Sequence, residues 1–283
     1  GPLSHAEQDR EAQLDEVLQQ RPGKNRQPRG PKQPGNPALN PNQAPQEDLG
    51  VAGARYLNVS PDGKQLAFAL HGDLWVVPIG GGRAQRLTLN EANDIKPVWS
   101  PDGKHIAFTS DRSGSFDVWI MNADGGVPTR LTYSDAVDHV NAFAPDGKSV
   151  IFQSTRNLAW NIFSVSIDGG TPALLVADAP STAAQMCAAD GMVYYQFSAS
   201  DAKVKAYRGS ANDELYRCTP GEIPERLTDN DQNDREPNVS PDGLSLFFTR
   251  ETGPAKRTYN LFAMDLETQQ ETQLSQLDSD GMR

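Results

Sequence analysis

Short runs in which apolar and polar residues alternate dominate the chain from residue 54 onward, and glycine-rich turns separate them. One run follows each Asp-Gly turn, as at residues 65–68, 105–108 and 245–248. A second apolar run comes next, as at residues 73–77 and 117–121, followed by a turn and a run that often ends in Arg-Leu-Thr. Alternation with a period of two predicts β-strands. Together with an innermost strand before each Asp-Gly turn, the pattern therefore predicts groups of four short antiparallel strands.

The turn phrases mark an internal repeat. Ser-Pro-Asp-Gly at residues 60–63 recurs at 100–103 and 240–243, with Ala-Pro-Asp-Gly at 144–147 and a degenerate Ala-Ala-Asp-Gly at 188–191. The aspartates are separated by 40, 44, 44 and 52 residues, and periods of this length with strand patterning indicate propeller blades. Proline presets φ, aspartate bonds to local backbone and glycine accepts positive φ, so each phrase is expected to form a turn. A structural role in these turns is assigned to Asp62, Asp102, Asp146 and Asp242.

The expected fold is all-β: a propeller of five recognisable four-stranded antiparallel blades, preceded by a mostly disordered N-terminal tail. The propeller is placed at residues 54–283, with blades at about 54–90, 91–133, 134–178, 179–230 and 231–281. Trp75, Trp99 and Trp119 are expected to be buried between or within the blades.

The tail, residues 1–53, differs from the propeller in composition. It contains no aromatic residue, although the whole chain has 21, and it holds eight of the 21 prolines. Gly1-Pro2 is interpreted as the remnant of a cleaved purification tag. A short helix is predicted over residues 6–20, either fraying in water or docked on a partner or on the propeller. Residues 21–46, with five basic and no acidic side chains, are predicted to form an extended linker.

Charge restricts the possible partners. The chain carries a formal charge of -11, which divides into -1 for the tail (six basic, seven acidic) and -10 for the propeller (20 basic, 30 acidic). An acidic propeller repels phosphate, and the basic tail has no aromatic residues for base stacking, so we expect no nucleic-acid partner. No run approaches the roughly 18 to 20 apolar residues of a spanning helix, so no transmembrane segment is expected.

The repeat also resembles a known family. Residues 99–112, with their continuation at 117–126, are similar to the β-propeller repeat of TolB and of tricorn-type peptidases, and the resemblance covers about residues 54–281. Two features favour the tricorn-like branch. The propeller starts too early for the α/β domain that precedes it in TolB, and residues 205–216, 226–228 and 234–240 are similar to a stretch of tricorn-like N-terminal propellers.

Blade number is a separate question. The resemblance implies a ring of about six or seven blades, whereas five are recognisable in this chain. Either five blades close by themselves or the chain is a fragment of a longer protein. We favour the fragment, because an unclosed ring leaves unpaired edges.

Residues with catalytic or metal-binding chemistry are sparse. None of the four histidines has His-Glu-x-x-His spacing, and no phosphate loop or nucleophile elbow is present. The turn aspartates lie one per blade, too far apart to share a calcium ion. Cys187 and Cys218 belong to one blade, so a disulfide is conceivable, but two free thiols are favoured. We therefore expect no cofactor, no metal site and no enzymatic activity.

The channel mouth is the candidate binding site. Residues that begin the innermost strand of each blade gather around one opening of a propeller. The candidates there are Asp94, Lys96, Asp138, His139, Asn141, Arg235, Glu236 and Asn238. Within residues 198–212, an insertion in the fourth blade, Lys205, Tyr207 and Arg208 form a second candidate contact. Solvated rim loops without a ligand are the alternative for both sets.

The resemblance implies a binding module of the periplasm or cell surface. The first hypothesis is the N-terminal propeller of a tricorn-like peptidase, which gates or guides peptides toward a downstream catalytic domain. The alternative is a stand-alone TolB-like envelope scaffold that binds a protein or a peptidoglycan-associated partner. A propeller enzyme would need clustered acids and histidines around the axis, and the one set to test is Asp94, Asp138, His139 and Glu236.

Overall fold

The computed structural model describes residues 53–178, 180–198, 212–252 and 258–277. The predicted tail helix at residues 6–20 and the predicted linker at 21–46 lie outside the described residues. So do Lys205, Tyr207 and Arg208 of the insertion in the fourth blade.

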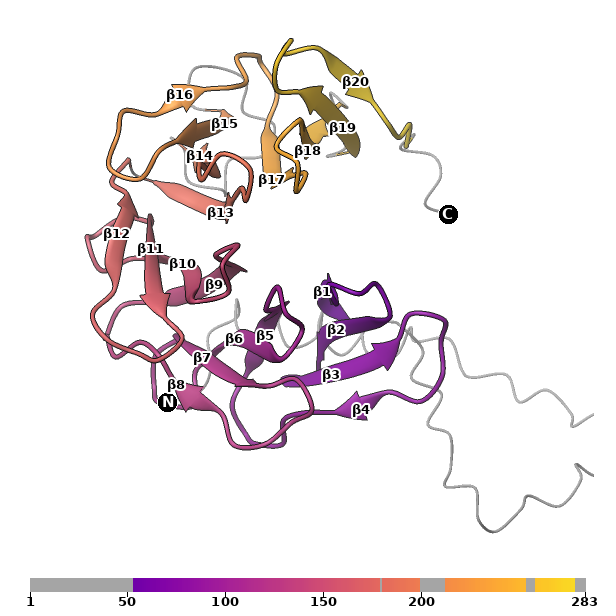
Figure 1. Cartoon of the computed structure of the whole chain (residues 1–283), viewed down its shortest axis with the longest axis vertical. Helices are drawn as coiled ribbons and strands as arrows, with labels where there is room; N and C mark the ends of the chain where they lie inside the picture. Colours follow the sequence, from indigo (N-terminus) through magenta and orange to yellow (C-terminus); the bar gives the residue numbers. More distant parts are fainter. Residues whose placement is uncertain (1–52, 179, 199–211, 253–257, 278–283) are drawn as a thin grey trace, which may run out of the picture. The chain divides into compact units, whose positions relative to one another are not determined.

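The described residues form twenty strands in five antiparallel sheets, each of four strands in sequence order (Figure 1). Blades 1 and 2 consist of β1 (Arg55–Val59), β2 (Gln65–Leu70), β3 (Asp73–Pro78), β4 (Gln85–Arg86), β5 (Asp94–Trp99), β6 (His105–Ser110), β7 (Asp117–Asn122) and β8 (Thr129–Arg130). Blade 3 consists of β9 (Asp138–Phe143), β10 (Ser149–Ser154), β11 (Asn161–Ser166) and β12 (Ala173–Val176). Blades 4 and 5 consist of β13 (Ser181–Met186), β14 (Val193–Ser198), β15 (Asp213–Cys218), β16 (Glu225–Arg226), β17 (Asp234–Val239), β18 (Ser245–Glu251), β19 (Tyr259–Asp265) and β20 (Glu271–Gln273).

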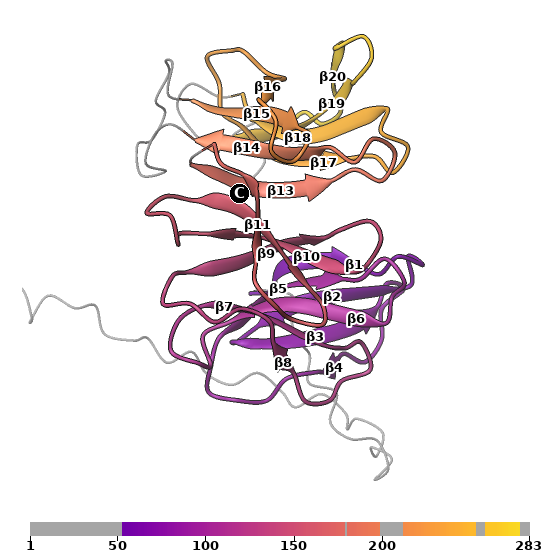
Figure 2. The ribbon, with the colours of Figure 1, turned by 60° about the vertical axis from the view of Figure 1, so that its left-hand side comes forward.

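This arrangement confirms the predicted fold class, a propeller of five four-stranded antiparallel blades. The first strands of successive blades lie next to one another in the order β1, β5, β9, β13 and β17. Figure 2 shows the blades following each other in sequence order. No helix occurs in the part of the chain that the structure describes.

The core lies between blades, in four apolar clusters that each join two successive sheets. Between blades 3 and 4, for example, Ile151 and Ile162 pack with Ala184, Val193 and Tyr195, and all five are fully buried. Side chains alternate across a strand, so the second and third strands of an internal blade bury one set against the preceding blade and the other against the next. This two-sided burial explains why these strands are more continuously apolar than a strand with one solvated face.

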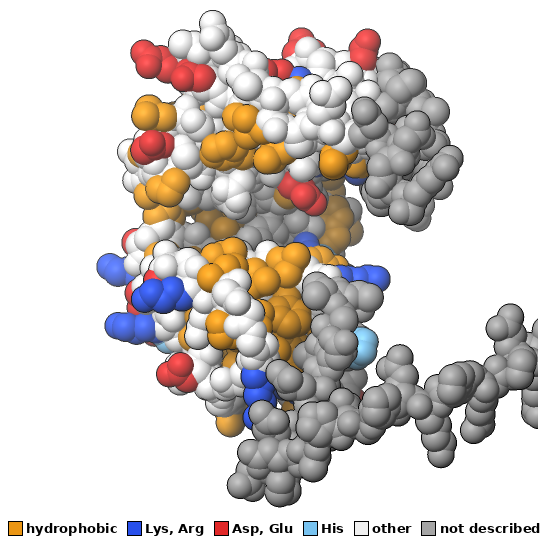
Figure 3. Space-filling view, turned by 90° about the vertical axis from the view of Figure 1, so that its right-hand side faces the viewer, with side chains coloured by type: hydrophobic (Ala, Val, Ile, Leu, Met, Phe, Trp, Pro, Cys, Tyr) orange, Lys and Arg blue, Asp and Glu red, His pale blue; other side chains and the backbone are white. Residues whose placement is uncertain are grey.

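The two terminal blades each present one apolar face that no described blade covers. Phe247 and Leu261 of blade 5 correspond to Ile151 and Ile162 of blade 3, yet they are 36% and 41% exposed instead of 0%. On blade 1, Val59 is likewise 51% exposed. Figure 3 shows hydrophobic side chains gathered on this side of the molecule. The expectation of a longer chain stays a prediction.

The repeated Arg-Leu-Thr phrase fastens the short outer strand to the third strand. In blade 2, Arg130 Nη2 donates to Asp117 Oδ2 (2.7 Å), and Val118 N donates to Thr132 Oγ1 (3.0 Å). Blade 1 repeats both contacts with Arg86 and Thr88. Outer strands of two residues form few backbone hydrogen bonds with the third strand. The hydrogen bonds of the buried carboxylate, the guanidinium group and the hydroxyl therefore stabilise the outer edge of the blade.

The tryptophan prediction is correct for one residue of three. Trp99 is buried (7% exposed), whereas Trp75 and Trp119 are half-buried. Trp75 and Trp119 pair with the two-residue outer strands, which are too short to cover the indole rings. Guanidinium groups cover them in part: Arg86 Cζ lies 5.8 Å from the centre of the Trp75 ring, and Arg112 Cζ lies 4.8 Å from that of Trp119.

The Ser-Pro-Asp-Gly turns are held by their own side chains. In blade 1, Ser60 Oγ donates to Asp62 Oδ1 (2.7 Å), Lys64 N donates to the same oxygen (3.1 Å), and Gly63 has a φ of 71°. The same contacts recur around Asp102 and Asp242. The hydrogen bond from the serine hydroxyl is the main reason why the pKa of each of the three carboxyl groups is lowered. These aspartates therefore stabilise the turns.

Both cysteines are buried free thiols, the alternative that the sequence favoured. Cys187 lies just after β13, and Cys218 ends β15. Burial is the main cause that raises the pKa of the Cys218 thiol to about 11.

Candidate functional site

A β-bulge near the start of the first strand shapes the channel mouth. In β1, β5, β13 and β17 two residues of the first strand lie opposite one residue of the second strand, so the pairing register shifts by one residue, and β9 has a register shift at the equivalent place. One bulge residue in each of those four strands has a positive φ: Tyr56 (56°), Lys96 (52°), Ala183 (51°) and Glu236 (55°). Bulges re-aim side chains and are common at functional sites.

In blades 2, 4 and 5, a side chain of the preceding blade accepts a hydrogen bond from the backbone of the first strand. Asn58 Oδ1 accepts from Trp99 N (3.0 Å) between blades 1 and 2, and Gln153 Oε1 accepts from Ala183 N (3.2 Å) between blades 3 and 4. Gln196 Oε1 accepts from Glu236 N (3.4 Å) in the same way between blades 4 and 5. Buried backbone amides need such partners, so the preceding blade holds the bulges of β13 and β17 and the end of β5.

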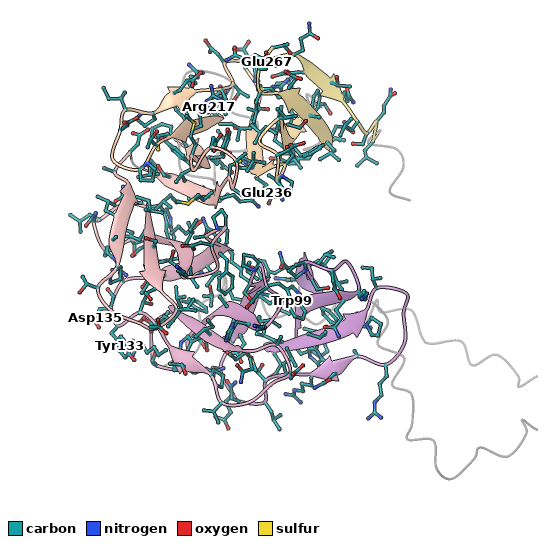
Figure 4. The ribbon with its side chains drawn as sticks, in the orientation of Figure 1. Trp99, Tyr133, Asp135, Arg217, Glu236 and Glu267 are labelled. Carbon is teal, nitrogen blue, oxygen red and sulfur yellow. The ribbon has the colours of Figure 1, made fainter. Side chains whose placement is uncertain are left out.

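Side chains from three other blades interact with Lys96 near the start of the first strands, and we call Tyr56, Lys96, His139 and Glu236 the axial cluster. Lys96 Nζ lies 6.0 Å from the centre of the Tyr56 ring. Its ammonium interacts electrostatically with Glu236, which favours the charged amine, and with His139. Figure 4 places Glu236 on the side of β17 that faces the space enclosed by the blades.

Lys96 is half-buried and forms no ion pair with any described residue. Burial lowers the pKa of its ammonium group, and the attraction of Glu236 opposes that shift. An ammonium group that has lost part of its hydration without gaining a close carboxylate is pre-organised to receive an anionic or carbonyl oxygen.

His139 packs against two aromatic rings. Its ring lies 5.3 Å from that of Phe116 and 5.6 Å from that of Trp160, and its buried Nδ1 has no hydrogen-bond partner among the described residues. Burial, followed by repulsion from Lys96, lowers the pKa of His139 to about 4. The imidazole is therefore neutral at pH 7, and the cluster offers an apolar surface beside the lysine.

The structure assigns a different environment to Asp94 and Asp138. Both are fully buried, and they pair with Arg112 and Arg156, with Nη2–Oδ2 distances of 2.8 Å in each case. Asp234 pairs with Arg250 at the equivalent place (Nε–Oδ1, 2.7 Å). These carboxylates brace the first strand and do not line an open surface.

The other candidate residues from the sequence lie in different environments. Arg235 contacts Asp213, so its guanidinium is engaged within the rim. Asn141 is half-buried, and in the amide orientation that satisfies its neighbours its side-chain oxygen accepts from Ala184 N (2.7 Å). Asn238 is exposed beside the bulge of β17. The structure thus brings Lys96, His139 and Glu236 together, while the remaining candidates lie around them or in buried ion pairs.

Sequence reasoning missed the aromatic part of the site. Phe116 and Trp160 each immediately precede a third strand, at Asp117 and Asn161, and this shared position is a signal in the sequence. The carbonyl of Phe116 accepts from Asp138 N, and that of Trp160 accepts from Ser181 N, both at 2.8 Å. These loops therefore lie against the next blade at the mouth.

The described residues contain no group of three or more His, Cys, Asp or Glu side chains that could hold a metal ion. Among the same residues, no helix is long and apolar enough to cross a membrane.

Five four-stranded blades around an axis, with a polar and aromatic cluster at one mouth, define a β-propeller with a candidate binding site on its axis. A family model described as the tricorn protease N-terminal beta propeller domain matches residues 54–282. The chain belongs to this family.

Among curated proteins, the chain is 48% identical over 52 residues to the putative tricorn protease homolog 2 of Streptomyces coelicolor. That match covers 18% of this chain and 4% of the relative, so the chain spans only a small part of the curated protein's length.

Among solved structures, the chain is similar to a putative TolB from Agrobacterium tumefaciens, with a TM-score of 0.67 and 22% identity over 78% of this chain and 80% of that one. It is also similar to the tricorn protease, with a TM-score of 0.65 and 18% identity over 80% of this chain and 22% of the other. At these identities the likeness shows the fold alone.

Proposed function

We propose that this propeller is a non-catalytic module that binds a peptide or protein segment at its channel mouth, through the axial cluster. The observation that carries the proposal is the convergence of Tyr56, Lys96, His139 and Glu236 from four different blades. A segment entering the axis would meet an ammonium group, a carboxylate and an aromatic surface at once. Such a mixed set recognises backbone carbonyls, chain termini and side chains better than it recognises one small ligand.

Catalysis by the acids of the mouth is disfavoured on chemical grounds. A general acid–base pair requires two groups that are free to exchange protons with a substrate. Asp94 and Asp138 are bound to Arg112 and Arg156 in buried ion pairs, and His139 stays neutral until the pH approaches 4. Binding is the role that these environments support.

Family membership refines the proposal. The module acts as the N-terminal gating or substrate-guiding domain of a tricorn-like peptidase, in which a separate domain supplies the catalytic residues. Export to the periplasm or cell surface is part of this proposal, and it is supported by the likeness to TolB. Sequencing the parent gene beyond residue 283 tests the gating role, because a peptidase domain downstream is required.

A second candidate is a TolB-like envelope scaffold that binds a protein or a peptidoglycan-associated partner. The specific observation in its favour is that the similarity to the Agrobacterium TolB extends over 80% of that chain. A stop codon immediately after residue 283 would favour this candidate over the first.

Binding at the mouth is tested by the fluorescence anisotropy of fluorescein-labelled casein peptides mixed with the purified chain. Lys96→Met and Glu236→Gln should each weaken binding by about fivefold or more, because each removes a charge that no second group replaces. Lys104→Met is the matched control, since Lys104 is an exposed lysine on a turn of the same blade. Equal affinities for all four proteins would show that the axial cluster does not bind these peptides.

A further inference from the structure

A pocket of about 320 Å³ lies between blades 3 and 4, next to the Asp-Gly turns that follow their first strands. Its walls include Pro145, Asp146, Ser164, Met186 and Ala188. The axial cluster stands near the start of the first strands, whereas this pocket adjoins their ends, so the two sites are separate. Its volume is at the lower end of the range for small-ligand sites, about 300 to 1,000 Å³.

The pocket arises because a contact that recurs between other blades is missing here. A Cβ placed on Gly103 would lie 3.9 Å from Cδ of Pro61 in the preceding turn, and one on Gly147 would lie 3.7 Å from that of Pro101. Between blades 4 and 5, a Cβ on Gly243 would lie 3.0 Å from Ala189 Cβ. At Gly191, the equivalent glycine of blade 4, nothing lies within 4 Å. The turns of blades 3 and 4 therefore stand apart.

The carboxylate at this pocket also lacks the partners that its counterparts have. Asp62 and Asp102 each accept from a serine hydroxyl, and a lysine ammonium lies 3.5 Å and 3.7 Å from them. In blade 3 the serine is replaced by Ala144, and Asp146 accepts from Lys148 N (2.9 Å) without an ion pair to the Lys148 ammonium. Asp146 therefore keeps spare acceptor capacity beside the pocket.

The remaining walls combine an apolar surface with hydroxyl groups. Pro145, Met186 and Ala188 supply carbon surface, and Ser149 and Ser164 add two hydroxyl groups that can accept a hydrogen bond. A lysine side chain has an apolar stem and a charged head. Its stem would pack on the carbon surface while its ammonium group reached the Asp146 carboxylate.

The geometry points to a lysine-binding pocket: the space between the turns of blades 3 and 4 takes the side chain of a lysine from a peptide or protein partner, with Asp146 as the counter-ion. Charge complementarity selects a cationic side chain, and the single carboxylate favours one ammonium group. The site does not depend on peptide binding at the axial cluster.

The test follows the ¹³C-labelled methyl group of Met186 by NMR, with the signal assigned from Met186→Leu. The probe is the peptide acetyl-Ala-Lys-Ala-amide, added to about 10 mM, ten times the dissociation constant of a weak millimolar site. A saturable shift is expected with this peptide. The norleucine analogue has the same aliphatic stem without the charge, and its affinity for the chain should be at most a tenth of that of the lysine peptide.

Asp146→Asn should weaken binding of the lysine peptide at least tenfold, while Asp102→Asn, the matched change in the equivalent turn of blade 2, should leave it unaltered. Ala188→Trp fills the pocket without touching the carboxylate and should abolish the shift; thermal melting confirms that each variant is folded. Equal affinity for the norleucine peptide would identify an apolar site and overturn the proposal. Absence of a shift, or unchanged binding in Asp146→Asn, would also overturn it. Lys96→Met should leave the shift intact, which separates this result from any failure at the axial cluster.

Discussion

The uncovered face of blade 5 makes a quantitative prediction about stability. Ile162 of blade 3 and Leu261 of blade 5 occupy the same position on the third strand, but Ile162 is fully buried and Leu261 is 41% exposed. Ile162→Ala removes buried surface and leaves a cavity, which costs about 3 to 4 kcal/mol. Leu261→Ala leaves no closed cavity and forfeits only part of a side chain's burial, so it should cost about 1 to 1.5 kcal/mol.

The expected difference of about 2 kcal/mol corresponds to roughly 4 to 8 °C in Tm for a domain of this size. The assay is thermal and urea unfolding of both variants, followed by circular dichroism. Phe163→Leu and Phe262→Leu are the matched controls, because both rings are buried (5% and 9% exposed) and stack on a neighbouring phenylalanine at 5.8 Å. These controls should lose the same stability. If Ile162→Ala and Leu261→Ala also lost equal stability, another surface must cover blade 5 in solution, and the reasoning would be refuted.

Three further predictions concern buried polar groups. Asp117→Ala should cost about 3 kcal/mol in urea unfolding, because Arg130 would keep its charge in the blade edge without a partner. Burial lowers the pKa of His139 to about 4, so between pH 6.5 and pH 4 the unfolded chain binds a proton that the folded chain does not. The free energy of unfolding should therefore fall as the pH drops through this window, and His139→Phe should reduce that dependence. Cys187 and Cys218 should react with a thiol reagent at pH 8 only after denaturation, when two thiols per chain are titrated.

Local chemistry made the fold predictable from the sequence. A Ser-Pro-Asp-Gly turn is held by hydrogen bonds between residues two to five positions apart, as between Ser60 and Asp62, so the residues that form it are adjacent in the chain. The repeat of these turns, with alternating apolar runs between them, determines strand number and order. The burial of Trp75 and Trp119 could not be predicted from the same local pattern, because their exposure depends on the length of the outer strand beside them.

The site was only partly predictable, because neighbours along the strand have different environments. Asp94 and Lys96 are two residues apart, yet the first is buried against Arg112 and the second belongs to the axial cluster. The Asp94–Arg112 spacing of 18 residues recurs in Asp138–Arg156, and this repetition in the sequence would have indicated a structural pair.

The blades, their order and their turns follow from the amino-acid sequence, because those features depend on interactions within a few residues. Which polar groups are available to a ligand depends on how the blades pack. The bulge that re-aims Lys96 depends on the pairing register, and the aromatic rings around His139 come from two blades. The pocket beside Asp146 exists because one contact between turns is missing. Each of these depends on how separate blades pack, a relation between residues distant in the chain.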